Sequence, residues 1–161
     1  MNGAPGDSLA KQAAALRVIV GAMAGGVALL GAVTLFLFVR GPAAPASPKA
    51  FDTLRLFSIV DAVLFLSSWA MSGVLFQTLS APGTFAALQS AVIVRAAARE
   101  GSALLGIVVC LLGALSGALR VQPAYWANAL PGALFVGWVL ATLPSEDSIR
   151  GLLLDGSAQK R

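Results

Sequence analysis

The sequence predicts an all-α integral membrane protein, a bundle of four transmembrane helices. Three observations lead to this fold class: 58% of the 161 residues are hydrophobic, only 11% are charged, and the mean hydropathy is +0.85. A soluble domain has about 45–50% apolar and about 25% charged residues. A 16.3 kDa chain folded in water would have too small an interior for this many apolar side chains. The composition therefore excludes a soluble enzyme, a disordered chain and a disulfide scaffold.

Four apolar segments are long enough to cross a bilayer, which takes about 20 mostly apolar residues in a helix. They cover residues 18–39, 56–76, 101–119 and 123–143, and Pro131 is expected to kink the last of them. The first could instead be a cleaved signal peptide, because basic residues precede it and small residues follow it. A signal has an apolar core of about 7–15 residues, and this run is longer. We therefore expect it to be retained as the first span of a single membrane domain.

The connecting segments predict how the spans are joined. Residues 41–49 are rich in Pro and Ala and predict a semi-extended linker, whereas Gln122 and Pro123 leave only a tight turn between spans three and four. Residues 84–100 are Ala-rich without a breaker, so we expect one long third helix, extended on the cytoplasmic side. The tail, 144–161, is expected to contain a short amphipathic helix on the membrane surface.

The distribution of basic residues predicts the orientation. Four spans put both termini and the middle loop on one side, with seven Lys and Arg residues, against four on the other: Arg40, Lys49, Arg55 and Arg120. Cytoplasmic segments of membrane proteins carry an excess of Lys and Arg. We expect a multi-pass protein of a bacterial inner membrane with both termini in the cytoplasm.

Small residues at four-residue spacing predict where the helices approach one another. Close packing of such residues is a main contribution to helix association in lipid. We expect this packing within the bundle, with homo-oligomerisation as the alternative, at Gly21, Gly25, Gly106, Gly113 and Gly117.

Few ionisable residues lie near the spans, and such residues are functional candidates by default. Asp61 lies inside the second span; it is expected to be solvated or paired with Arg55, Arg40 or Arg120. Glu100 opens the third span after Arg95 and Arg99, and we expect an interfacial cluster whose arginines extend to lipid phosphates. In this topology Asp61 and Glu100 lie near opposite faces of the bilayer.

Several kinds of chemistry are not expected from this chain. It has no histidine, which excludes His-based metal sites and Ser-His-Asp catalysis. The single cysteine, Cys110, lies in an apolar run and is expected to be an inert packing residue. The net charge of +4 comes from residues that flank the spans, not from a stripe that would bind nucleic acid. We expect no enzymatic activity, no cofactor and no metal.

Residues 89–108 carry an aliphatic-Ile-Arg motif, then a Glu-Gly pair and an Ala- and Leu-rich span, and residues 143–150 form a Pro-containing polar stretch. In these features the chain resembles a group of small, functionally uncharacterised bacterial membrane proteins with four spans. The resemblance covers the second half of the chain by motif and the first half by hydropathy, and it implies a fold without an activity.

Residues 82–108 are also similar to the second helix of the proton-translocating c subunits of rotary ATPases. In that family a carboxylate about eighteen residues after a loop proline carries the proton, and Pro82 and Glu100 have this spacing. The Arg-Gln-Pro loop and the glycine ladder of the family are missing, and Arg95 and Arg99 would keep Glu100 ionised.

The functional expectation is a structural or accessory membrane component, with the lipid bilayer and either a membrane-protein partner or a second copy as its contacts. The alternative is ion or proton translocation by an oligomer, with Glu100 as the carrier.

Overall fold

The protein is all-helical wherever its structure, a computed structural model, describes it: residues 5–41, 47–80 and 84–143. The helices are α1 (Pro5–Arg40), α2 (Pro48–Ser80), α3 (Phe85–Leu115), α4 (Ala118–Val121), the 3₁₀ helix η1 (Pro123–Ala129) and α5 (Leu130–Thr142). Four stretches within them are long and apolar enough to span a membrane: Ala10–Arg40, Pro48–Ser80, Phe85–Leu115 and Pro123–Thr142. This confirms the predicted four-span helical fold.

The helix ends follow from local sequence. Ser47 and Thr84 each precede a helix, and their hydroxyl oxygens accept hydrogen bonds from the backbone N–H groups of Ala50 and Ala87, both at 3.3 Å. Such caps satisfy N–H groups that have no partner within the helix. Because nothing interrupts α3 between residues 85 and 115, the predicted continuity of residues 84–100 with the third span is confirmed. The predicted amphipathic tail helix lies outside the described residues.

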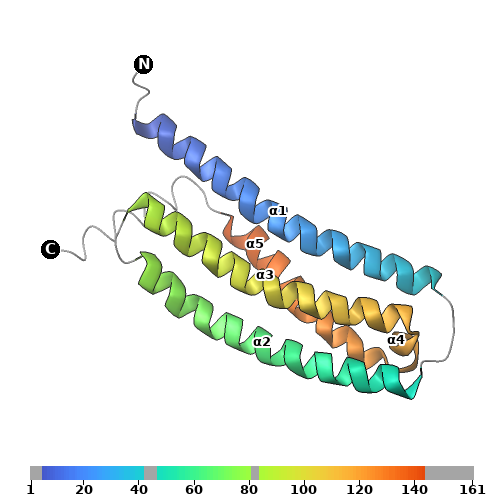
Figure 1. Cartoon of the computed structure of the whole chain (residues 1–161). Helices are drawn as coiled ribbons and strands as arrows, with labels where there is room; N and C mark the ends of the chain where they lie inside the picture. The colour runs from blue at the N-terminus through green and yellow to red at the C-terminus, as the bar shows by residue number, and fades with distance from the viewer. Residues whose placement is uncertain (1–4, 42–46, 81–83, 144–161) are drawn as a thin grey trace.

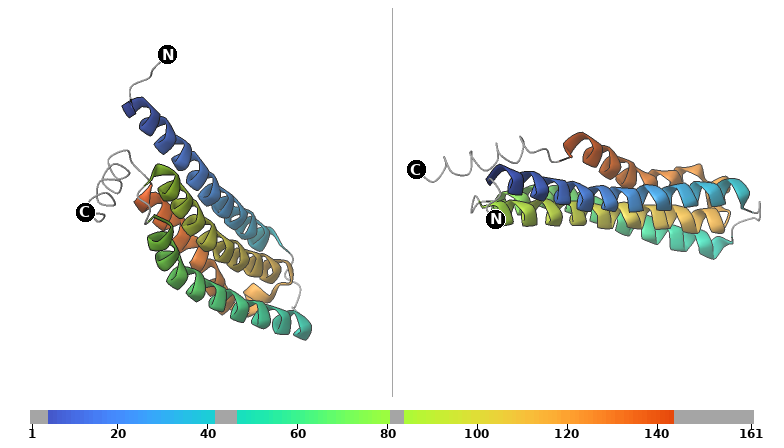
Figure 2. Two further views of the ribbon diagram at one scale, coloured as in Figure 1. Left: turned by 60° about the vertical axis from the view of Figure 1, so that its left-hand side comes forward. Right: turned by 90° about the horizontal axis from the view of Figure 1, so that it is seen from above.

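Helix α3 is the centre of the bundle. It contacts α1, α2, η1 and α5, and the views in Figures 1 and 2 show the four long helical stretches side by side along a common direction. Helices α1 and α3 run parallel, and α2 and α5 run in the opposite sense. The start of α1 and the end of α5 therefore lie at the same end of the bundle, as an even number of spans requires.

The corner after α3 differs in detail from the prediction. The third helix ends at Leu115, not near residue 119, because Gly117 adopts a left-handed conformation with φ 74°. Left-handed backbone is accessible to glycine at little cost and commonly ends a helix. The fourth span is also not one uniform helix: it begins as η1 and becomes α-helical at Leu130, next to Pro131, where we predicted a kink.

The main core lies between α1, α3 and α5. Its fully enclosed side chains include Leu16 and Val27 from α1 and Phe135 from α5, packed with Ala96 and Ala103 from α3. The small alanines on α3 allow large side chains from both neighbours to reach the centre. Helix α2 packs against α3 mainly outside this core. Leu54 of α2 makes an apolar contact with Val109 of α3, and several polar side chains of α2 lie in the same interface.

Candidate functional site

The buried face of α2 is more polar than its outer face. Ser58, Asp61, Ser68 and Ser72 recur at three- and four-residue spacing and are directed toward α3 or η1, while Leu66 on the outer side is 67% exposed. Residues three, four and seven apart share one face of a helix. These four polar side chains are thus turned away from lipid, as expected where exposing them to hydrocarbon would be costly.

Asp61 is the most deeply buried carboxylate in the described residues, with only 2% of its surface exposed. Its Oδ1 atom is enclosed and accepts no hydrogen bond. The expectation that Asp61 is solvated or paired with Arg55, Arg40 or Arg120 is wrong. The side chain is enclosed and forms no ion pair with Arg55 in the described residues. Arg40 stacks on the Phe36 ring, and Arg120 donates to the carbonyl oxygens of Phe38 and Gly41. Asp61 is therefore a buried acid without a basic partner.

Gly106 allows the close approach that encloses Asp61. A Cβ atom on Gly106 would lie 2.9 Å from Oδ2 of Asp61 and would overlap the backbone oxygen of Asn128. Asn128 is itself fixed, because its side-chain amide donates hydrogen bonds to Oγ of Ser58 at 3.0 Å and to the Tyr125 carbonyl at 2.8 Å. Gly106 thus brings α2, α3 and η1 together at one point, a close approach of the kind we expected at this glycine.

A cavity of ≈ 870 Å³ extends from Asp61 along the gap between α2 and η1. Ser58 and Asn128 line it beside Asp61, and Asp52 and Arg55 line its exposed end. The cavity therefore runs from polar, exposed residues near the start of α2 to a buried carboxylate. Sequence reasoning did not predict this cavity, because its two walls are far apart in the chain.

Arg99 of α3 forms a second buried polar centre. It lies beside Ser72, eleven residues after Asp61 along α2. Its guanidinium carbon lies 4.2 Å from the ring centre of Trp69 and 4.4 Å from that of Trp138, and its Nε atom donates to Oγ of Ser72 at 3.2 Å. The side chain is only 5% exposed. The expectation that Arg99 extends to lipid phosphates is therefore wrong: the cation is held between two indole rings, which attract it through their quadrupoles.

Arg95 belongs to the same centre. Its guanidinium carbon lies 5.1 Å from the ring centre of Phe76 and 5.4 Å from that of Trp138, so two cations share one indole. Both arginines contact aromatic rings rather than a carboxylate in the part of the chain that the structure describes. Their arrangement joins α2, α3 and α5 on the side of the bundle where α1 begins.

The positions of the two predicted acids differ from expectation. Asp61 lies against Gly106, and Glu100 is six residues earlier on the same α3 helix. Six residues correspond to about 9 Å along a helix axis, far less than the ~30 Å hydrocarbon thickness of a bilayer. The expectation that Asp61 and Glu100 lie near opposite faces of the membrane is therefore wrong, because α2 and α3 begin earlier than their most apolar segments.

The remaining predicted packing glycines have three different environments. A Cβ on Gly113 would lie 3.0 Å from Leu119, so this glycine does accommodate a neighbour. Gly117 shapes the turn after α3 instead of a helix contact. A methyl group added to Gly21 or Gly25 would meet no atom within 4 Å, and the expectation that these two glycines pack within the bundle is wrong.

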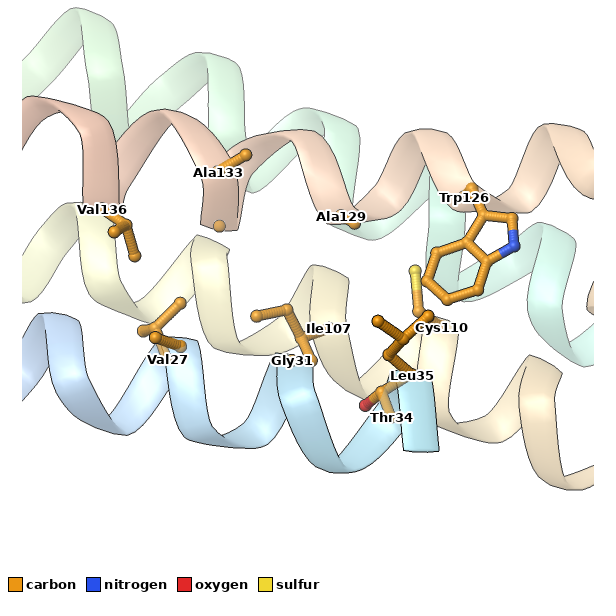
Figure 3. Close-up of a pocket in the computed structure, with 12 residues that line it drawn as sticks. Val27, Gly31, Thr34, Leu35, Ile107, Cys110, Trp126, Ala129, Ala133 and Val136 are labelled. Carbon is orange, nitrogen blue, oxygen red and sulfur yellow. The ribbon is translucent and has the colours of Figure 1, made fainter. Parts of the chain in front are cut away.

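A smaller cavity of ≈ 360 Å³ lies between α1, α3 and α5 and is lined mainly by aliphatic side chains (Figure 3). Two of its polar side chains are already engaged: the Thr34 hydroxyl donates to the Leu30 carbonyl, and the Cys110 thiol lies 3.5 Å from the Tyr125 carbonyl. Cys110 is only 1% exposed, in keeping with the packing role expected for it. This cavity therefore offers mainly apolar surface.

Sequence reasoning singled out Asp61 and Arg99 but missed Ser58, which lies beside Asp61. The available signal was the recurrence of Ser58, Asp61, Ser68 and Ser72 on one helical face, which a search for small residues alone does not weigh. Trp69 and Trp138 gave no signal, because aromatic residues in apolar spans are common and their meeting around Arg99 depends on helix packing.

Comparison with known proteins gives no match: no protein-family model, no curated protein and no solved structure resembles the chain significantly.

Proposed function

We propose that this chain is a structural or accessory component of a membrane assembly, and that it acts through α1. The observation that carries the proposal is the open face of α1 around Gly21, Gly25 and Gly26. A Cβ atom added to any of these glycines would meet no atom of a packed neighbour within 4 Å. Glycines four residues apart let two helix backbones approach closely, and they lower helix stability where they serve no packing purpose. A helix face that carries glycines and has no neighbour in the bundle is suited to a helix of another protein or of a second copy.

The geometry of α1 supports this assignment. Its inward side chains, Leu16, Val20 and Val27, are buried against α3 and α5. Val18 and Leu29, on the same side as Gly25, are 70% and 67% exposed. Helix α1 thus packs against α3 and α5 with one face, and its glycine-containing face points outward.

Photo-crosslinking in native membranes tests the proposal. A benzoylphenylalanine at Ala22, on the glycine face, is expected to give a discrete protein adduct, either a second copy or another membrane protein. The same probe at Leu66, on the outer face of α2, is the control and should label lipid only. Absence of any protein adduct at Ala22, or equal adducts at both positions, would contradict an α1 partner.

A matched pair of substitutions makes the test specific to the glycines. Gly25→Ile adds bulk to the proposed contact and should abolish the adduct at Ala22. Gly73→Ile adds the same side chain on α2, where Gly73 also has nothing within 4 Å and has no small residue four positions away. The adduct should persist in Gly73→Ile; if both variants lose it equally, the effect is not a contact at α1.

The proposed setting is a bacterial inner membrane with both termini in the cytoplasm. The support is the distribution of Lys and Arg. Burial of Arg99 in the bundle weakens this bias, because a residue inside a span does not count as a loop charge. Reporter fusions at the C-terminus decide the orientation: a cytoplasmic reporter should be active there, and activity of a periplasmic reporter would reverse the proposal.

A second candidate function is ion or proton translocation by an oligomer with Glu100 as the carrier. The observation that favours it is the short axial separation of Glu100 from Asp61, about 9 Å by helix rise. In liposomes, Glu100→Gln should abolish proton flux while leaving the melting temperature unchanged, and Asp52→Asn should leave the flux intact. Unchanged flux in Glu100→Gln would remove this candidate.

A further inference from the structure

The cavity between α2 and η1 contains a buried acceptor that the protein itself does not use. Asp61 lines the cavity, is 2% exposed, and keeps Oδ1 without a hydrogen-bond donor. A carboxylate removed from water without a partner costs several kcal/mol. A ligand that brings a positive charge and an N–H donor to this point would compensate that cost.

The other groups around Asp61 suit an ammonium group. Ser58 and Asn128 line the same end of the cavity, and the Asn128 amide nitrogen is already committed to Ser58 and Tyr125. The amide oxygen of Asn128 accepts no hydrogen bond in the part of the chain that the structure describes, so it remains available as an acceptor. An ammonium carries several donors and no acceptor, so it complements oxygen atoms of this kind.

The walls of the cavity suit an organic body rather than a bare ion. Phe51, Phe65 and Tyr125 line it, and aromatic rings both attract cations and cover apolar groups. Its volume, ≈ 870 Å³, falls in the range of sites for small organic molecules, about 300–1,000 Å³. A metal ion would lack ligands, because no group of three His, Cys, Asp or Glu residues occurs in the described ranges.

The charge of the cavity has the matching sign. The lining residues include two acids, Asp52 and Asp61, and one base, Arg55. The lining thus carries one net negative charge with all three ionised. Asp52 and Arg55 lie near the start of α2, so a ligand would enter from the end of the bundle opposite to the start of α1.

We infer that this cavity is a binding site for a small aromatic or aliphatic amine, with its ammonium group at Asp61 and its apolar body along Phe65 and Tyr125. The site is independent of the glycine face of α1, and neither proposal requires the other.

The test is binding of 2-phenylethylammonium to the purified full-length protein in a nonionic detergent, measured by titration calorimetry and by the shift in melting temperature. The neutral analogue 2-phenylethanol has nearly the same shape and is the ligand control. We expect saturable binding of the amine and at least about tenfold weaker binding of the alcohol, as one charged hydrogen bond provides.

Two substitutions separate the site from general partition into the micelle. Asp61→Asn removes the charge with nearly unchanged size and should weaken amine binding by about ten- to hundredfold. Ala127→Trp adds bulk to an exposed wall of the cavity while keeping Asp61, and it should abolish binding if Asp61→Asn fails to fold. Glu100→Gln removes an acid that does not line the cavity; it is the control and should change affinity much less.

The inference fails under any of three results. The amine does not bind saturably, the alcohol binds equally well, or the affinity for the amine is the same in wild type, Asp61→Asn and Ala127→Trp.

Discussion

Gly106 gives the sharpest test of the packing described above, because the structure leaves no space for even one methyl group. A Cβ at this position would overlap the Asn128 carbonyl oxygen and lie 3.2 Å from its carbon and 2.9 Å from Oδ2 of Asp61. The main obstacle is backbone, which cannot rotate away as a flexible side chain can. Gly106→Ala must therefore push η1 and α3 apart.

The magnitude follows from two opposing terms. Adding bulk to a packed site costs about 1–3 kcal/mol, and a backbone obstacle places Gly106→Ala at the upper end, about 3 kcal/mol. Alanine is a better helix former than glycine by about 1 kcal/mol, which offsets part of this cost. The expected net change is a loss of about 2 kcal/mol in the free energy of unfolding.

Gly101→Ala is the matched control on the same helix, since nothing lies within 4 Å of a methyl group there. It should gain up to about 1 kcal/mol from helix propensity alone. For a chain of this size a change of 1 kcal/mol shifts the melting temperature by about 2–4 °C. The two variants should thus differ by about 6–12 °C.

The assay is thermal unfolding in mild detergent, followed by tryptophan fluorescence and by size-exclusion chromatography of the heated samples. Equal melting temperatures for Gly106→Ala and Gly101→Ala would refute the close contact between α3 and η1. A more stable Gly106→Ala would also refute the enclosure of Asp61 that depends on it.

Three further predictions concern the remaining polar residues. Arg99→Lys should lower the free energy of unfolding by about 2 kcal/mol more than Arg99→Met does, measured by thermal unfolding. Lysine keeps a buried charge but loses the planar stacking between two indole rings, and the reverse order of stability would contradict this stacking. Arg120→Gln should lower the free energy of unfolding by about 1 kcal/mol, because two hydrogen bonds to the end of α1 are lost. Arg40→Gln should lower it less, and equal losses in the two variants would contradict a stabilising role for the Arg120 hydrogen bonds. Cys110 should react with a maleimide far more slowly in the folded protein than after denaturation in SDS, and rapid labelling in mild detergent would contradict its burial.

The local features of the chain were predictable because they depend on neighbouring residues. The four apolar segments, the continuity of residues 84–100 with the third span and the break near Pro131 all follow from short stretches of sequence. Helix boundaries were less predictable: α2 and α3 extend well beyond their most apolar residues. Hydropathy locates the part of a helix that prefers lipid, whereas a helix continues until a breaker ends it.

The environment of each polar side chain depended on tertiary structure. The sequence by itself determined that Asp61 and Arg99 are unusual, because charges in spans are costly wherever they lie. Only the packing decided that Asp61 meets Gly106 and a cavity, that Arg99 lies between Trp69 and Trp138, and that Gly25 is left outward. The physical reason is that helix rotation and register are set by contacts between segments far apart in the chain. A hydropathy pattern of this uniformity leaves that rotation open, since lipid solvates every apolar face equally well.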